Sequence, residues 1–199
     1  QTRALEILDR RKPGDQDIVP ALDWLAGRQA ADGSWGNDVE STSRTLLAYF
    51  GYGEISQAGP YKAQIGKGLA WLLQAKIDPG SLPHALKTMA LAEAVAMGDP
   101  AADSKTVQES VDLLLKAQKD DGSWGGLPVT SWAVLALKSS RMAELKVPDA
   151  AFLKASGYLE TLYARDAAGR GSFGGTPAGT ARAVILRQVM GLQGGVAEG

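Results

Sequence analysis

The stretch QAADGSWG at residues 29–36 returns almost unchanged as QKDDGSWG at residues 118–125. Each copy follows an amphipathic segment, residues 21–25 in the first case and residues 110–114 in the second. The copies lie 89 residues apart (118 − 29), which is twice a period of about 45 residues. A period of about 20–50 residues is typical of proteins built from stacked structural repeats. The sequence therefore predicts a repeat architecture.

Two weaker copies, one around Trp71 and one leading to Phe173, complete a series of four. In each repeat an amphipathic segment, with apolar residues at i, i+4 and i+7, precedes a segment that is apolar nearly all round. Such patterns predict outer helices and enclosed inner helices, respectively, and no strand pattern accompanies them. The expected fold is all-α: an α/α toroid-like array of about four helix-pair repeats, with apolar inner helices and amphipathic outer helices. The repeats cover about residues 17–53, 64–99, 106–140 and 151–191, after a short extension or packing helix at 1–16 and before a flexible tail at 192–199.

Composition excludes several classes of function. The 199 residues include 21 Lys and Arg against 22 Asp and Glu, so the net charge is −1 and no basic excess favours nucleic acid. There are 0 cysteines and one histidine, His84, and we therefore expect neither a metal nor a cofactor. No apolar run reaches the roughly 18–20 residues that span a bilayer, so we expect a soluble domain. The compartment and a removed signal peptide or anchor stay open.

A glutamine followed by Asp-Gly-Ser-Trp-Gly at the end of an outer helix resembles the QW repeat of the terpenoid cyclases and protein prenyltransferases. The second and third repeats are also similar to uncharacterised bacterial proteins described as prenyltransferase and squalene oxidase repeats. This resemblance implies the α/α toroid fold but names no activity. We expect the motif residues to hold the turns between helices, because glutamine amides, positive-φ glycines and buried aromatic rings can all close a turn. These structural residues are Gln29, Asp32, Gly33, Trp35, Gln118, Asp121, Gly122, Trp124 and Phe173.

The catalytic groups of the resembling families are missing from the sequence. The best match to the cyclases' Asp-x-Asp-Asp motif is DQDI at residues 15–18, which lacks the last acid. The pair Asp120-Asp121 continues as Gly-Ser-Trp, so it belongs to the repeat turn and not to an Asp-Asp-x-x-Asp motif for magnesium. The prenyltransferase zinc site needs a cysteine. We therefore assign no catalytic residue.

Polar residues gather in the first turns of the apolar segments, where the N-termini of parallel inner helices would form one mouth. Hydroxyl groups, one imidazole, one indole and basic groups would suit an anionic ligand with an apolar tail. The alternative is that the hydroxyl groups are ordinary helix caps. The candidate ligand-binding residues are Thr42, Arg44, His84, Lys87, Thr130, Ser131, Trp132, Thr180 and Arg182.

Two functions from different classes follow. The first is a noncatalytic repeat module that binds a protein or a surface, which agrees with the missing catalytic groups and the small number of repeats. The alternative is a small-molecule binder, or a terpene cyclase-like or prenyltransferase-like enzyme, acting at the mouth on an amphipathic or isoprenoid-like ligand with an anionic head. If the four repeats leave the ring open, the end repeats expose apolar sides that need a partner or a second copy. The reaction, the ligand and the oligomeric state stay open.

Overall fold

The computed structural model describes residues 17–191. In this part of the chain, eight helices and one β-hairpin follow one another, which confirms the all-α class and the helix-repeat array. The elements are α2 (Ile18–Ala26), α3 (Val39–Tyr52), α4 (Lys62–Gln74), α5 (Leu82–Ala96), α6 (Ser104–Lys116), α7 (Leu127–Met142), α8 (Asp149–Thr161), β1 (Tyr163–Arg165), β2 (Gly171–Phe173) and α9 (Pro177–Val189). The expected extension at 1–16 and tail at 192–199 lie outside the described residues.

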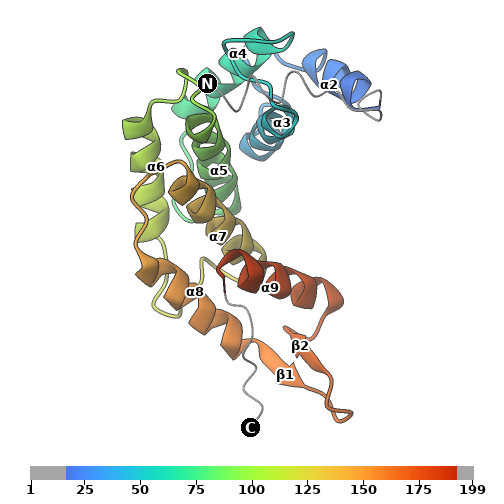
Figure 1. Ribbon diagram of the computed structural model, residues 1–199, viewed down its shortest axis with the longest axis vertical. Coiled ribbons are helices and arrows are strands. Elements are labelled where there is room, and N and C mark those ends of the chain that lie inside the picture. The colour runs from blue at the N-terminus through green and yellow to red at the C-terminus, as the bar shows by residue number, and fades with distance from the viewer. Residues whose placement is uncertain (1–16, 192–199) are drawn as a thin grey trace.

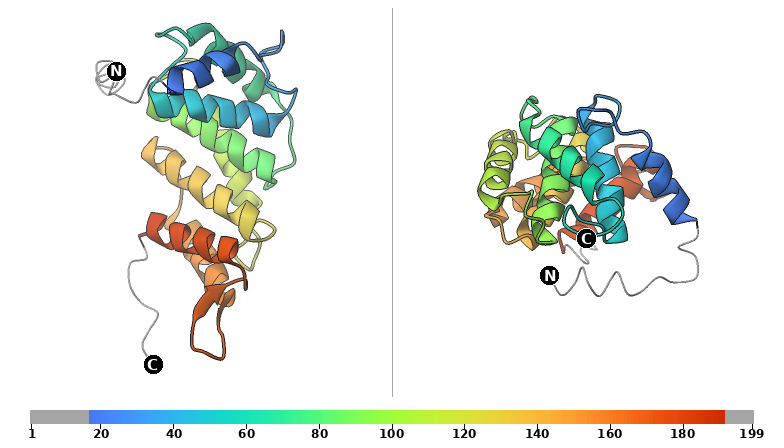
Figure 2. Two further views of the ribbon diagram at one scale, coloured as in Figure 1. Left: turned by 90° about the vertical axis from the view of Figure 1, so that its right-hand side faces the viewer. Right: turned by 90° about the horizontal axis from the view of Figure 1, so that it is seen from above.

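The helices form two layers in an open stack (Figure 1). The inner helices α3, α5, α7 and α9 lie side by side in this order, with α3 and α9 at opposite ends (Figure 2). In the other layer, α4 packs against α3, α6 against α5 and α8 against α7, so each of these outer helices contacts the inner helix that precedes it. The four helix pairs therefore continue one another in a row, and the two ends of the row do not meet.

Polar caps and prolines mark where several helices begin. The side chains of Asp38, Ser81 and Thr176 each accept a hydrogen bond from the backbone N–H three residues later. The first turns of α5, α7 and α9 also contain a proline, whose missing N–H has no helical partner at that position in any case. The starts of the inner helices are thus fixed by local sequence.

Two hydrophobic clusters fill the space between the layers. The first cluster includes Leu46 and Tyr49 of α3 and belongs to the N-terminal repeats, whereas the second includes Leu137 of α7 and Leu159 of α8. These four side chains are at most 1% exposed. The core therefore lies between inner and outer helices, and one face of the inner layer carries no second layer.

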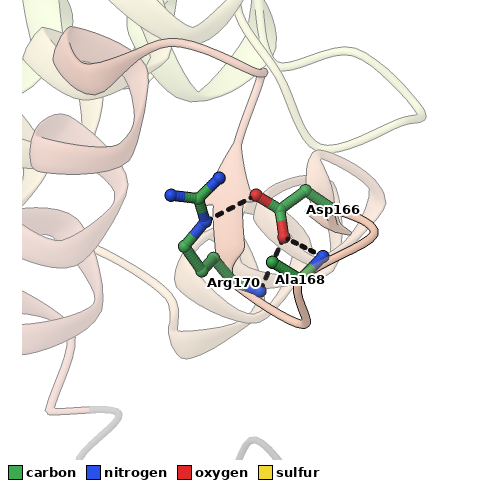
Figure 3. Close-up of polar contacts among 3 residues, drawn as sticks. All are labelled: Asp166, Ala168 and Arg170. Atoms are coloured by element: carbon green, nitrogen blue, oxygen red, sulfur yellow. Dashed lines mark hydrogen bonds and ion pairs between the residues drawn. The ribbon is translucent and has the colours of Figure 1, made fainter.

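The hairpin corrects the expectation that the chain has no strands. β1 and β2 are antiparallel strands of three residues each, in which Tyr163 pairs with Phe173. At the tip, the carboxylate of Asp166 accepts hydrogen bonds from the backbone N–H groups of Ala168 and Arg170 and from Nε of Arg170 (Figure 3). Three residues are too short to show the alternation from which a strand is recognised in sequence. The hairpin replaces the turn that the other repeats form before their inner helix.

Candidate functional site

The repeated glutamines close the turns between outer and inner helices and also connect neighbouring repeats. Nε2 of Gln29 donates to the carbonyl of Gly33 at 2.9 Å and to that of Gln64 in the next outer helix, α4, at 2.8 Å. Nε2 of Gln118 makes the same two bonds, to Gly122 at 3.0 Å and to Ala151 of α8 at 2.9 Å. A side-chain amide has two N–H donors, so both are used.

The tryptophans of the two strong copies are buried and hydrogen-bonded to the helix before them. Trp35 and Trp124 are each 4% exposed, and their indole N–H groups donate at 2.7 Å to the carbonyls of Leu25 and Leu114. Each ring therefore covers the end of its own outer helix, and its N–H bonds to a carbonyl of the last helical turn.

The aspartates of the same turns also bond within the turn. Backbone N–H and hydroxyl groups of Ser34 lower the pKa of Asp32, and Ser123 lowers the pKa of Asp121 in the same way. Both carboxylates therefore stay ionised and act as acceptors for the turn. None of these contacts leaves a group poised for acid–base chemistry.

One candidate ligand residue in each inner helix accepts a hydrogen bond from the turn before that helix. Oγ1 of Thr42 accepts the backbone N–H of Trp35 at 2.9 Å, and Oγ1 of Thr130 accepts that of Trp124 at 3.1 Å. In the fourth repeat, Oγ1 of Thr180 accepts the backbone N–H of Phe173. In the second repeat, Nδ1 of His84 accepts the backbone N–H of Gly80. We call Thr42, His84, Thr130 and Thr180 the latch residues, because each fastens an inner helix to its turn.

The other candidate residues lie in different surroundings. Oγ of Ser131 donates to the carbonyl of Leu127 within α7, and Nζ of Lys87 donates to the carbonyl of Ala75 at the end of α4. The remaining three, Arg44, Trp132 and Arg182, each follow a latch residue by two positions, so they occupy equivalent places on α3, α7 and α9. Arg44 and Arg182 are exposed and Trp132 is half-buried.

His84 belongs to a buried chain of polar groups whose hydrogen bonds fix its protonation. Because Nδ1 accepts from Gly80, the neutral ring carries its proton on Nε2, which lies 3.3 Å from Oγ of Ser110. Ser110 then donates to Oγ1 of Thr88, 2.8 Å away, and Thr88 donates to the carbonyl of His84. The imidazole thus donates to the serine and cannot act as the base that activates it.

Burial lowers the pKa of His84 to about 4, and the charge of Lys87 contributes to the same shift. The pKa of an unfolded histidine is about 6.5, so below that pH the unfolded chain binds a proton that the folded protein does not bind. Stability should therefore fall as the pH drops from about 6.5 to about 4, by up to ~3 kcal/mol. Urea unfolding across this range should show a steeper loss for the native chain than for His84→Asn, whose side-chain oxygen can still accept from Gly80.

Glu109 of α6 and Lys76 line the same cavity as His84 and Lys87 and are unchanged in the His84→Asn variant. Their contribution to the pH dependence therefore cancels in the comparison. Equal pH profiles for the native chain and the variant would contradict the buried, neutral histidine.

A cavity of about 330 Å³ opens between the end of α4, α5 and α6. Its lining includes His84, Lys87, Leu91 and Leu113. Burial lowers the pKa of Lys87. Its Nζ donates to the carbonyl oxygens of Leu73 and Ala75, at Nζ–O distances of 3.4 and 2.7 Å. This cavity therefore brings together two of the nine candidate residues and separates them from the other seven.

A row of apolar residues on the inner helices is absent from the candidate set drawn from the sequence. Each member follows a latch residue by five positions, and none of the four is buried although all are apolar. We call this row the apolar ladder; it consists of Leu47, Met89, Leu135 and Ile185. The sequence could have indicated the apolar ladder only after the latch residues were aligned, because these helices carry apolar residues on almost every side.

Within residues 17–191, no three histidine, cysteine, aspartate or glutamate side chains gather where they could hold a metal ion. None of the helices described in that range is long and apolar enough to cross a membrane.

Comparison with known proteins finds a similarity to a cyclase. The chain is 25% identical to the squalene–hopene cyclase of Zymomonas mobilis subsp. mobilis over 173 residues, which are 82% of this chain but 22% of that cyclase. No family model matches the chain, and no solved structure matches it. The chain thus spans about a fifth of the length of this curated relative, and the similarity points no further than the terpenoid cyclase superfamily.

Proposed function

We propose that this protein is a noncatalytic α/α-repeat module that binds a partner protein through the free face of its inner helices. The observation that carries the proposal is the apolar ladder, whose four members lie at equivalent positions on α3, α5, α7 and α9 and are all at least partly exposed. Contiguous apolar patches on a protein surface often mark interaction sites. The extended face of a helix-repeat protein is also the surface that such proteins commonly use for binding.

The charges beside the ladder indicate the chemistry of the partner. Arg182 is exposed, and its side chain makes no hydrogen bond or ion pair within residues 17–191. Arg44 pairs with Glu40 of its own helix at 3.0 Å and keeps about half of its side chain exposed. An apolar segment that also carries acidic side chains would therefore complement this face.

The cavity beside Lys87 supports a second candidate function, in which the protein takes an amphipathic or isoprenoid-like ligand with an anionic head. About 330 Å³ lies at the lower end of the size range of small-molecule pockets, and Lys87 supplies a cation at its wall. The similarity to squalene–hopene cyclase adds a cyclase-like or prenyltransferase-like reaction to this candidate. Against it stands the use of His84 and Lys87 as hydrogen-bond partners of the backbone.

Fluorescence anisotropy with two labelled helical peptides tests the first proposal. Both peptides carry leucine on one face, and the other face is glutamate in one peptide and lysine in the other. We expect the acidic peptide to bind the full chain and Leu135→Asp to weaken this binding at least tenfold. The matched control is Leu153→Asp on α8, because Leu153 is 68% exposed and lies away from the ladder.

Equal binding of both peptides, or equal binding to the two variants, would contradict a partner site at the ladder. Farnesyl diphosphate is the probe for the second candidate. Binding of farnesyl diphosphate that is lost in Lys87→Met, or its conversion to a product, would favour the small-molecule function instead.

A further inference from the structure

The last inner helix exposes a side that every other inner helix buries. Four positions after each latch residue lie Leu46, Thr88, Val134 and Val184. The first three are 0% exposed, whereas Val184 of α9 is 53% exposed. The following outer helices contribute to this cover, because a Cβ built on Gly68 of α4 would be 3.1 Å from Cδ2 of Leu46, and Thr88 hydrogen-bonds to Ser110 of α6. Ala181 and Gln188, which lie on the same side of α9, are exposed as well. We call Ala181, Val184 and Gln188 the forward face.

The first helix pair, α2 and α3, also exposes positions that are buried in the later repeats, on the opposite end of the stack from α9. Six positions after the latch residues lie Ala48, Ala90, Ala136 and Leu186, of which the last three are at most 1% exposed and Ala48 of α3 is exposed. On the outer helices, Ile18 of α2 is 44% exposed, whereas its repeat equivalents Ile65, Val107 and Ala151 are at most 4% exposed. We call Ile18 and Ala48 the rear face.

The internal repeats show what fits between these faces. The side of α5 that bears Ala90 packs against α3, and α4 packs against α3 at the same time. By the same repeat rule, α2 and α3 together form a seat for an inner helix that would precede α3. The alanine at position 48 leaves room for a close helix approach, as Ala90 and Ala136 do between the inner helices of the chain.

We propose that a second copy of this chain fills this seat head to tail, with the forward face of one copy against the rear face of the next. The contact continues the stack α3–α5–α7–α9 without any new type of helix packing. It leaves the apolar ladder free and joins the ladders of the two copies into one row. The inference concerns surfaces other than the proposed partner site, so it does not depend on the proposed function.

A head-to-tail contact uses two different faces, and this predicts a specific result for mixed variants. Val184→Glu disables the forward face, and Ala48→Glu disables the rear face; both residues are exposed, so the fold should tolerate the change. We expect sedimentation of the native chain to give a mass above 20.9 kDa that rises with concentration, and each variant alone to be a monomer. A mixture of the two variants should form dimers and nothing larger, because one intact face of each kind remains.

Leu153→Glu on α8 is the matched control and should assemble like the native chain, and circular dichroism verifies that each variant is folded. A native chain that stays monomeric at every concentration would overturn the proposal. So would a dimer that Val184→Glu abolishes but Ala48→Glu preserves, since this result would indicate a symmetric contact between two α9 helices. Peptide binding at the ladder is measured separately, so failure of either proposal can be recognised without the other.

Discussion

Replacement of Trp124 with alanine should lower the free energy of unfolding by about 3–5 kcal/mol. The side chain is 4% exposed, and its indole N–H donates to the carbonyl of Leu114 at 2.7 Å. The ring also lies against the turn before α5, because a Cβ built on Gly80 would be 3.5 Å from Cδ1 of Trp124. Alanine would therefore leave a cavity and an unpaired carbonyl at a point where α6, α7 and the start of α5 meet. Guanidinium unfolding followed by circular dichroism measures the loss.

Trp24 provides the matched control for this large effect. It is the same residue type in an outer helix, but it is 60% exposed, and its ring contacts the Arg28 side chain, whose Cζ is 5.0 Å from the ring centroid. Trp24→Ala should therefore cost less than about 1 kcal/mol. If Trp124→Ala lowered the free energy of unfolding no more than Trp24→Ala, the structural role assigned to the buried indole would be wrong.

The sequence contained enough information for the helix class and for the order of the helices. Two near-identical copies of a Gln-to-Gly stretch gave the period, and the contrast between amphipathic and apolar segments separated outer from inner helices. These features can be recognised within single segments of the sequence. The hairpin at β1 and β2 escaped detection because its strands are only three residues long.

The candidate ligand residues show where such reasoning ends. A threonine in the first turn of a helix has the same sequence signature whether it caps the helix, lines a pocket or accepts a bond from a distant turn. Thr42 and Thr130 accept the backbone N–H groups of tryptophans that lie seven and six residues earlier. Only the path of the turn decides which of these roles the threonine takes, and that path depends on contacts with the neighbouring repeat. The exposure of Ile185 and Val184 likewise depends on which elements pack against α9, and the pattern within α9 does not contain this information.

Replacement of Gly122 with alanine is expected to lower the free energy of unfolding by more than about 4 kcal/mol, through two separate costs. Gly122 has a φ of +87°, a left-handed conformation that costs an L-residue roughly 1–2 kcal/mol. In addition, the new Cβ would lie 2.0 Å from the carbonyl oxygen and 2.5 Å from the carbonyl carbon of Lys154. These are backbone atoms of α8, so the collision is relieved only if the turn and α8 move apart.

Gly98→Ala separates the two costs, because Gly98 has a similar φ of +72° but no atom lies within 4 Å of its Cβ position. This control should lose only the roughly 1–2 kcal/mol of the conformational cost. The excess at Gly122 should also appear in a particular place. Gln118 in the same turn donates to Ala151 of α8, so a turn pushed away from α8 stretches this bond as well. In Gly122→Ala, hydrogen exchange should therefore accelerate first in α8, while Gly98→Ala should leave α8 unchanged. Equal losses in the two variants would show that the turn and α8 do not depend on their close approach, and the joint between the third and fourth repeats would then rest on side-chain packing alone.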